Sequence, residues 1–439
     1  MRAGRILLAL LFGLGLFGAL VNGASIYSRF LYISVLLGII GWGWTRWSVR
    51  GLSLKRLSRV LRANVGDVFE ETYEVTNGSR IPAPWIEVIN QSVLPFAAGS
   101  RLFTFVLGRQ RRNYLARTWL TRRGDFQLGP TRISTGDPFG LFSAGKVMET
   151  KETLVVFPVV HEIGSCLSPP GLLPGGQVIR RKSYDITPHA AGVREYVHGD
   201  AMKRIHWPTS ARRNQLMVKE FEQDPQAEIW LYLDSQEAVH FEKPHQQEEL
   251  PLDSMVFMKR PKYKLPPATL EYSVSIAASL THYFIGQRRS MGYVSAGQTF
   301  TIHPAERSER QEAKILETLA FVEANGTLSI AALVAAQASQ MPQGSSVILV
   351  TPTVRADLLH AVDDLQMRNL RPLVVLLNAE TFGGPPGTET LIDALRERRV
   401  PVCLISCDDN LSQALSEIPS TFNSQDIRPW QPPVFSQST

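Results

Sequence analysis

The sequence predicts three structural parts: two transmembrane helices at the N-terminus, a β-sandwich domain, and an α/β doubly wound domain. Two nearly uncharged apolar segments come first, and short runs typical of β-strands follow them. Buried strand-like runs then alternate with helical segments as far as about residue 420. A chain of 439 residues with 44% hydrophobic and 20% charged residues has enough apolar material for two folded cores.

The apolar segments predict a membrane hairpin within residues 1–48, with helices at about 6–21 and 30–47. Each uncharged stretch is slightly shorter than the ~20 residues that span a bilayer. A short polar stretch joins the two segments, so both ends of the hairpin face the same side. A cleavable signal peptide is the alternative interpretation of the first segment, and the presence of the second segment argues against it.

Basic residues predict the orientation of this hairpin. Arg2 and Arg5 precede the first segment and a basic cluster follows the second, whereas the loop between them contains Arg29. By the positive-inside rule, an integral membrane protein with cytoplasmic soluble domains is expected. The bilayer is therefore one expected partner.

The charge distribution also favours contact between the N-terminal part of the chain and a membrane surface. Residues 1–160 hold 20 Lys and Arg against 9 Asp and Glu, which gives +11, and the remainder holds 26 against 31, which gives −5. This excess of positive charge beside the apolar segments fits anionic lipid better than nucleic acid. Because the chain has no recognisable nucleic-acid-reading motif, nucleic-acid binding is not expected.

Residues 49–162 predict a β-sandwich, with an immunoglobulin-like topology as the first expectation. Short alternating runs are separated by turn signals, and Asn77-Gly78 is interpreted as a hairpin turn. Two turns are more distinctive than the others, and we expect their residues to shape turns rather than to bind a ligand. These residues are Gly124, Gly129, Pro130, Asp137, Pro138, Phe139 and Gly140.

A Pro- and Gly-rich linker is expected at 163–190, and the α/β domain at 226–420. Its apolar runs, bounded by helical segments, predict a mostly parallel sheet with ligands at the carboxyl ends of the strands. A long mixed-charge loop at 238–267 interrupts the first strand-to-helix connection. Residues 421–439 form a tail.

Between these domains, residues 191–225 bring charged and aromatic residues unusually close together. The pattern consists of Gly192, Arg194, Glu195, Tyr196, Gly199, Asp200, Arg204, Ile205, His206, Trp207, Ser210, Ala211, Arg212, Lys219 and Glu220. Together with GDPFGLF upstream and the paired N-terminal segments, it resembles the bacterial and archaeal family called domain of unknown function 58. The resemblance implies a von Willebrand factor type A-like C-terminal domain, a MoxR-type AAA ATPase partner and no established catalysis.

The type A fold commonly holds Mg²⁺ through an Asp-x-Ser-x-Ser motif, since a hard cation prefers oxygen ligands. Here Asp234 is in place, but Gln236 and Ala238 replace both serines, and Thr351 is followed by Pro352 with no carboxylate beside it. The metal site is therefore expected to be degraded. We expect no cofactor, with Mg²⁺ at Asp234 as the alternative.

The signature residues allow three interpretations. Arg194, Arg204 and Arg212 could form a fixed ion-pair network with nearby carboxylates, or they could provide a binding surface. Glu195, Asp200 and Glu220 are the carboxylates available for this within the segment. The third interpretation is an acid–base pair of His206 with a carboxylate.

The local structure expected for the signature is a helix from about Asp200 to Ser210. Asp200 would cap this helix, and Pro208 would interrupt it. His206 and Trp207 are expected to pack against the sheet.

A membrane-anchored interaction module or adaptor is the leading functional hypothesis. The first alternative is a hydrolase-like enzyme that uses the Arg, His and Asp cluster. Against it, the chain has no P-loop, no Ser-His-Asp spacing and no His/Cys metal set. The second alternative is a basic surface that binds lipid or nucleic acid, formed by Arg109, Arg111, Arg112, Arg122 and Arg123.

Overall fold

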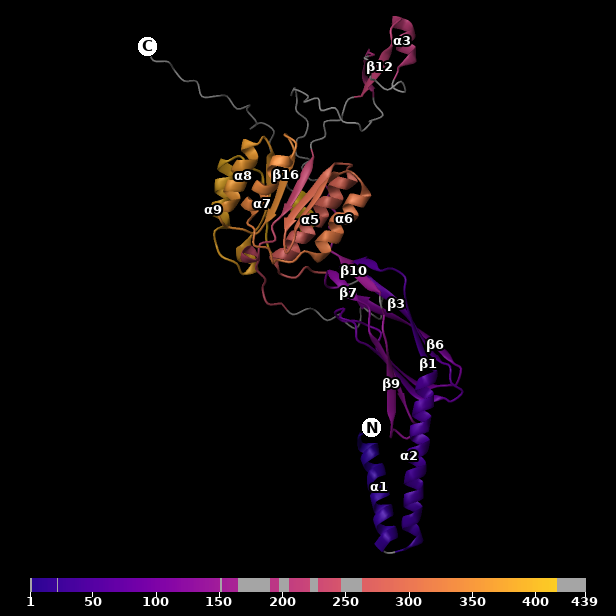
Figure 1. Ribbon diagram of the computed structural model, residues 1–439. Helices are drawn as coiled ribbons and strands as arrows, with labels where there is room; N and C mark the ends of the chain where they lie inside the picture. Colours follow the sequence, from indigo (N-terminus) through magenta and orange to yellow (C-terminus); the bar gives the residue numbers. More distant parts are fainter. Residues whose placement is uncertain are drawn as a thin grey trace, which may run out of the picture. The chain divides into compact units, whose positions relative to one another are not determined.

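The computed structural model describes residues 2–21, 23–150, 152–164, 190–196, 205–221, 228–245 and 263–416 (Figure 1). The side chains of residues 2–3, 190–194 and 219–221 are outside this description. The chain divides into two compact units. The first is Met1–Val160, Pro244–Pro267 and Ala313–Val322, and the second is His161–Lys243, Ala268–Glu312 and Glu323–Thr439. Most of the expected linker, the middle of loop 238–267 and the tail lie outside the described residues, as do Gly199, Asp200 and Arg204.

Two antiparallel helices open the first unit, α1 (Arg2–Val21) and α2 (Ser25–Gly51). Both are apolar and long enough to cross a membrane, so the two expected N-terminal apolar helices are confirmed. Glycines allow the helices to pack closely, as in many membrane helix pairs. A Cβ atom at Gly15 would lie 2.7 Å from the Leu31 nitrogen, and one at Gly18 would overlap the Tyr27 ring. α2 extends beyond the expected range of 30–47 at both ends.

A β-rich region with several sheets follows, which confirms a β domain after the helices. One sheet has the order β1 (Leu52–Ser58), β3 (Val68–Asn77), β6 (Arg111–Trp119). A second has the order β5 (Arg101–Val106), β4 (Ala83–Asn90), β8 (Thr131–Gly136), β9 (Ser143–Met148). The third has the order β2 (Arg62–Asn64), β10 (Thr153–Phe157), β7 (Gly124–Gln127). Apolar residues of β1, β3, β4, β6 and β8 form one shared core.

The interpretation of Asn77-Gly78 as a hairpin turn is wrong. β3 pairs with β1 and β6, whereas β4 pairs with β5 and β8, so the loop after Asn77 passes between two sheets. The Asn77 side chain is fully buried, and its amide group donates to the carbonyls of Ile81, Val106 and Leu107. Its side-chain oxygen accepts from the Ser79 nitrogen and hydroxyl. Asn77 therefore organises a crossover loop.

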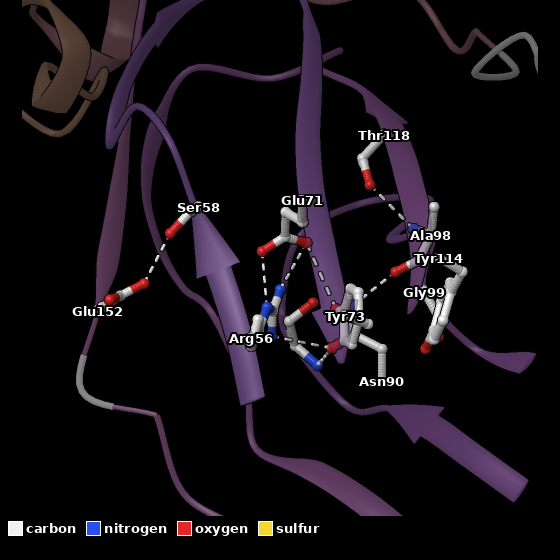
Figure 2. A network of polar contacts seen from close by, with 11 residues as sticks. Arg56, Ser58, Glu71, Tyr73, Asn90, Ala98, Gly99, Tyr114, Thr118 and Glu152 are labelled. Carbon is white, nitrogen blue, oxygen red and sulfur yellow. Dashed lines mark hydrogen bonds and ion pairs between the residues drawn. The ribbon is translucent and has the colours of Figure 1, made fainter. Parts of the chain in front are cut away.

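A buried ion pair lies inside this β-rich region (Figure 2). Arg56 of β1 donates to both carboxylate oxygens of Glu71 of β3, at 2.6 and 2.8 Å, and the two side chains are 4% and 1% exposed. The Arg56 guanidinium also lies 3.4 Å from the Asn90 side-chain oxygen on β4, in the other sheet. The Tyr73 ring lies beneath this guanidinium at 5.3 Å and stacks on Tyr114. The ion pair thus joins two neighbouring strands of one sheet through charge-assisted hydrogen bonds, and the longer Arg56–Asn90 contact reaches the second sheet.

The second unit contains a six-stranded sheet with helices on both faces (Figure 1). Its order is β15 (Phe300–Glu306), β14 (Met291–Ala296), β13 (Ile229–Leu233), β16 (Ser346–Thr351), β17 (Arg371–Leu377), β18 (Val402–Ile405), and β15 alone is antiparallel to its neighbour. The α-helices that follow β13 in the sequence are α5 (Thr269–Gly286), α6 (Glu309–Phe321), α7 (Ile330–Gln337), α8 (Asp357–Met367), α9 (Thr388–Glu397) and α10 (Leu411–Ser416). Short 3₁₀ turns are η2 (Glu237–Val239), η3 (Ala338–Gln340) and η4 (Ala379–Phe382).

The hydrophobic runs explain this sheet directly. All residues of β13, β14 and β16 are buried, as expected for strands covered on both faces. Residues of α7, α8 and α9 join one face of the sheet in a common core. The carboxyl ends of the five neighbouring parallel strands β14, β13, β16, β17 and β18 therefore meet along one edge, where the sequence predicts a site.

Removing one partner of the buried ion pair tests its structural role. Arg56→Met leaves the Glu71 carboxylate buried without its cation, so we expect the free energy of unfolding to fall by about 3–5 kcal/mol. Arg117→Met is the matched control, because the Arg117–Glu70 pair is exposed and its loss costs less than about 1 kcal/mol. Urea titration of the detergent-solubilised protein, followed by pulse proteolysis, measures both changes. Equal losses in the free energy of unfolding of the two variants would contradict the structural role of the Arg56–Glu71 pair.

Candidate functional site

A buried carboxyl group lies at the carboxyl edge of the six-stranded sheet. Asp234 directly follows β13, and its backbone nitrogen donates to the Val350 carbonyl at 3.0 Å. Its side chain is 1% exposed. The Thr351 hydroxyl donates to Oδ2 at 2.7 Å, and the Gln236 nitrogen donates to Oδ1 at 3.1 Å. Each carboxyl oxygen therefore has a hydrogen bond from a neighbouring loop.

Burial raises the pKa of the Asp234 carboxyl from 3.8 to about 6. The hydrogen bonds from Thr351 and Gln236 lower this pKa, but by less than burial raises it. Asp357, in the first turn of α8, raises the pKa further, and Arg355 lowers it. The carboxyl is consequently easier to protonate than one in water.

The polar contacts continue from Asp234 to the start of α5. His240 Nε2 lies 3.0 Å from the Asp234 backbone carbonyl, which can only accept, so Nε2 carries a proton. His240 Nδ1 lies 3.0 Å from the Thr269 hydroxyl oxygen, and this oxygen accepts a hydrogen bond from the Phe241 nitrogen at 2.9 Å. His240 therefore connects the first strand of the sheet to the helix that follows it.

Gly326 packs against the same edge of the sheet. Its nitrogen donates to the Ser235 carbonyl and its carbonyl accepts from the Glu237 nitrogen, both at 2.9 Å. A Cβ atom at this position would collide with the Ala296 carbonyl at the end of β14. The Ser235 hydroxyl is buried here without a hydrogen bond. The edge beside Asp234 is thus tightly packed.

The residues around Asp234 do not fit the Mg²⁺ site of the type A fold. At one serine position, Gln236 contributes its backbone nitrogen to Asp234, and at the other Ala238 lies within η2. In the described part of the chain there is no group of three or more His, Cys, Asp or Glu residues that could hold a metal ion. The hydroxyl groups of Thr351 and Thr353 are both engaged with neighbouring loop atoms.

The signature segment forms a small module with its own sheet. Strands β11 (Ala190–Glu195) and β12 (Met217–Phe221) pair antiparallel, with Arg194 opposite Val218 and Gly192 opposite Glu220. The short helix α3 (Trp207–Arg213) precedes β12. The Ser210 hydroxyl lies 3.0 Å from the His206 carbonyl and accepts from the Met217 nitrogen at 2.8 Å. This hydroxyl joins the helix to the strand.

Two expectations for this module are wrong. The described helix begins at Trp207 with His206 at its N-cap position, and Pro208 lies in its first turn, where proline favours helix formation rather than interrupting it. Trp207 does not pack against a sheet, because it is 66% exposed. His206 is half-buried, and its Nδ1 lies 2.7 Å from the Thr209 hydroxyl, a partner that the acid–base interpretation did not include.

The surface of the module is both aromatic and basic. Trp207 and Leu216 are exposed, and Arg212 and Arg213 are exposed in the last turn of α3. Glu195 is exposed at the end of β11, and Tyr196 is half-buried beside it. Lys219 lies opposite Val193 in the hairpin.

The arginines of the basic-surface alternative do not form one group. Arg109, Arg112 and Arg122 are exposed, and Arg111 pairs with Glu74 at 3.0 Å. Arg123 is buried and donates to the carbonyls of Leu319 and Val322 within the first unit. Arg123 therefore has a structural role.

Comparison with known proteins agrees with the family resemblance. Residues 192–252 match the family described as "Protein of unknown function DUF58". The chain is also 23% identical over 285 residues to the "Uncharacterized protein YeaD" of Bacillus subtilis (strain 168), which covers 64% of this chain. The match spans 63% of the length of that relative. Both findings support the DUF58 family, whose function is unknown.

Solved structures are only weakly similar. The CARDB domain of the PF1109 protein from Pyrococcus furiosus is 13% identical, with 24% of this chain and 91% of that chain covered and a TM-score of 0.15. A GH20 exo-β-N-acetylglucosaminidase from Vibrio harveyi is 7% identical, with 82% and 61% covered and a TM-score of 0.17. These scores are too low to support a functional argument.

The sequence interpretation missed His240, Thr269 and Gly326. A histidine six residues after the strand-end aspartate was the available signal for His240, but the segment was interpreted as an inserted loop. Gly326 gave no signal, because its close contact with Ala296 depends on the way the chain folds back.

The raised pKa of Asp234 predicts how stability depends on pH. A group whose pKa is higher in the folded than in the unfolded state stabilises the fold at low pH, and that stabilisation is lost as the pH rises from about 4 to about 6. Asp234→Asn removes the charge, so the variant should gain about 2–3 kcal/mol relative to wild type between pH 4 and pH 7. Thermal unfolding across this pH range measures the difference. Asp393→Asn, at an exposed ion pair, is the control and should follow the wild-type profile; an Asp234→Asn profile parallel to wild type would refute the assignment.

Proposed function

We propose that this protein is a membrane-anchored interaction module, or adaptor, that works with a MoxR-type AAA ATPase. The helical hairpin anchors it in the cell membrane with the soluble units in the cytoplasm, where ATP is available to such a partner. The exposed surface of the signature module is the docking site. No cofactor is required.

The exposure of Trp207 is the observation that carries this proposal. A tryptophan that is 66% exposed leaves a large apolar area in water, and tryptophan and arginine are enriched among the residues that dominate binding energy. Arg212 and Arg213 follow it on the same helix. The hydrogen bonds of Ser210 hold that helix on β12, so the surface is preorganised.

The order of the six strands supports a type A-like interaction domain. β13 lies at the centre, β14 and β15 lie on one side of it, and β16 to β18 follow in order on the other. In the proposed role the packed edge around Asp234 stabilises the domain, and binding to the partner takes place without a metal ion.

Loss of partner capture by Trp207→Ala tests the proposal. The full-length tagged protein is expressed in its native membrane and solubilised gently, and the proteins that co-purify are quantified by mass spectrometry. Removing a binding hot spot costs at least ~2 kcal/mol, so the recovered AAA ATPase should fall about thirtyfold.

Two further variants make this result interpretable. Met367→Ala removes an exposed apolar side chain on α8 and should leave ATPase recovery unchanged. Ser210→Ala removes the hydroxyl that joins α3 to β12. It shows how far ATPase recovery falls when the fold of the module itself is disrupted. If Trp207→Ala, with its thermal unfolding unchanged, still recovers the ATPase fully, the signature module is not the docking site.

A further inference from the structure

The turn between β8 and β9 is rigid and presents an aromatic side chain. The Asp137 carboxylate, which is buried, accepts hydrogen bonds from the backbone nitrogens of Phe139, Leu141 and Phe142. These contacts explain the distinctive GDPFGLF sequence as a turn-shaping motif. Phe139 at its tip is nonetheless 53% exposed, although it is large and apolar.

The same turn contacts the helical hairpin. Arg5 Nε of α1 donates to the Leu141 carbonyl at 2.9 Å, and its guanidinium lies 5.9 Å from the centre of the Phe142 ring. On α2, a Cβ atom at Gly41 would lie 3.2 Å from Phe142. The turn is therefore at the level of Arg5 and Gly41, where the uncharged part of α1 begins.

This level coincides with the expected boundary of the lipid. The apolar span Gly4–Val21 has 18 residues, or about 27 Å of helix, which is slightly less than the ~30 Å of bilayer hydrocarbon. Aromatic side chains at the interface compensate for such a mismatch. Trp42 of α2 is exposed beside Gly41, and Phe139 is a second aromatic residue at this level.

A second turn of the first unit lies farther along α2. The Gly78 nitrogen donates to the Gly51 carbonyl at 2.8 Å, and the Arg109 nitrogen donates to the Ser79 carbonyl at 3.0 Å. Arg80 and Arg109 are exposed here. Gly51 is about 15 Å beyond Gly41 along the helix, and the headgroup layer occupies about 5–7 Å of that distance, so Gly51 lies about one Debye length from the headgroups.

We propose that this end of the first unit is a lipid-docking surface, in which Phe139 inserts among the headgroups and Arg80 and Arg109 attract anionic lipid. The proposal rests on the membrane anchor of the proposed function. The β-rich part of the unit is then held against the bilayer by two kinds of contact in addition to its covalent connection to α2. Anionic phospholipid is the occupant that fits both the apolar and the cationic residues.

Photo-crosslinking of the full-length protein tests this surface. p-Benzoyl-phenylalanine replaces Phe139, and the protein is reconstituted in nanodiscs of phosphatidylcholine and phosphatidylglycerol in equal amounts. After irradiation, mass spectrometry detects phospholipid adducts. Leu16, exposed on α1, reports lipid contact of the anchor itself. Val93 is the matched control, because it is 77% exposed and follows the end of β4 that lies away from the turn between β8 and β9.

Lipid adducts at positions 139 and 16 but not at 93 are the expected result. Adducts at 16 with none at 139, or equal yields at 139 and 93, would overturn the docking surface and leave the anchor intact. No adduct at 16 would overturn the anchor and the docking surface with it.

The contribution of Arg80 and Arg109 to the binding of anionic lipid is tested separately. In the Arg80→Gln, Arg109→Gln double variant, the ratio of phosphatidylglycerol to phosphatidylcholine adducts at position 139 should fall by about fivefold for each arginine removed. An unchanged ratio would show that these two arginines are not part of the lipid-docking surface.

Discussion

The contact between Gly41 of α2 and the turn formed by Asp137–Phe142 is the constraint that connects the helical hairpin to the β-rich part of the first unit. Glycine on the helix allows this close approach, because a Cβ atom at position 41 would lie 3.2 Å from Phe142 and 3.5 Å from Asp137. The buried Asp137 carboxylate is needed on the other side, because it holds the turn in one shape through three backbone nitrogens. In the proposed membrane topology, this contact also determines which end of the β-rich region faces lipid.

In the described part of the second unit, the Asp234 carboxyl, whose pKa is raised, is buried, whereas the Trp207 side chain is exposed. Asp234 is enclosed by Thr351, Gln236 and the packed loop at Gly326, so its carboxyl is not open to a substrate. Trp207 is held on a small hairpin with most of its surface in water. A buried carboxyl group and an exposed tryptophan are the two features on which the proposed binding role rests.

Continuous apolar runs made much of the fold predictable. The strands β13, β14, β16 and β17 are fully or almost fully buried, so their apolar sequences identify them, and each of the two N-terminal helices contains a long apolar span. β15 was missed because it is half-exposed and has no alternating pattern. The burial of Asn77, the exposure of Trp207 and the contact of the GDPFGLF turn with α2 depend on distant segments, so no local pattern could reveal them. Asp234 was singled out through the family resemblance and its Asp-x-Ser-x-Ser motif, but its burial could not be predicted.

Cysteine labelling in intact cells tests most directly whether the hairpin spans the membrane with both soluble units in the cytoplasm. In a background with Cys166, Cys403 and Cys407 replaced by serine, a single cysteine is introduced at Ser25, beside the loop of the hairpin, or at Val93 in the β-rich region. A membrane-impermeant maleimide should label the cysteine at 25 in intact cells and the cysteine at 93 only after permeabilisation. Labelling at position 93 in intact cells would contradict the proposed topology and, with it, access to a cytoplasmic ATPase.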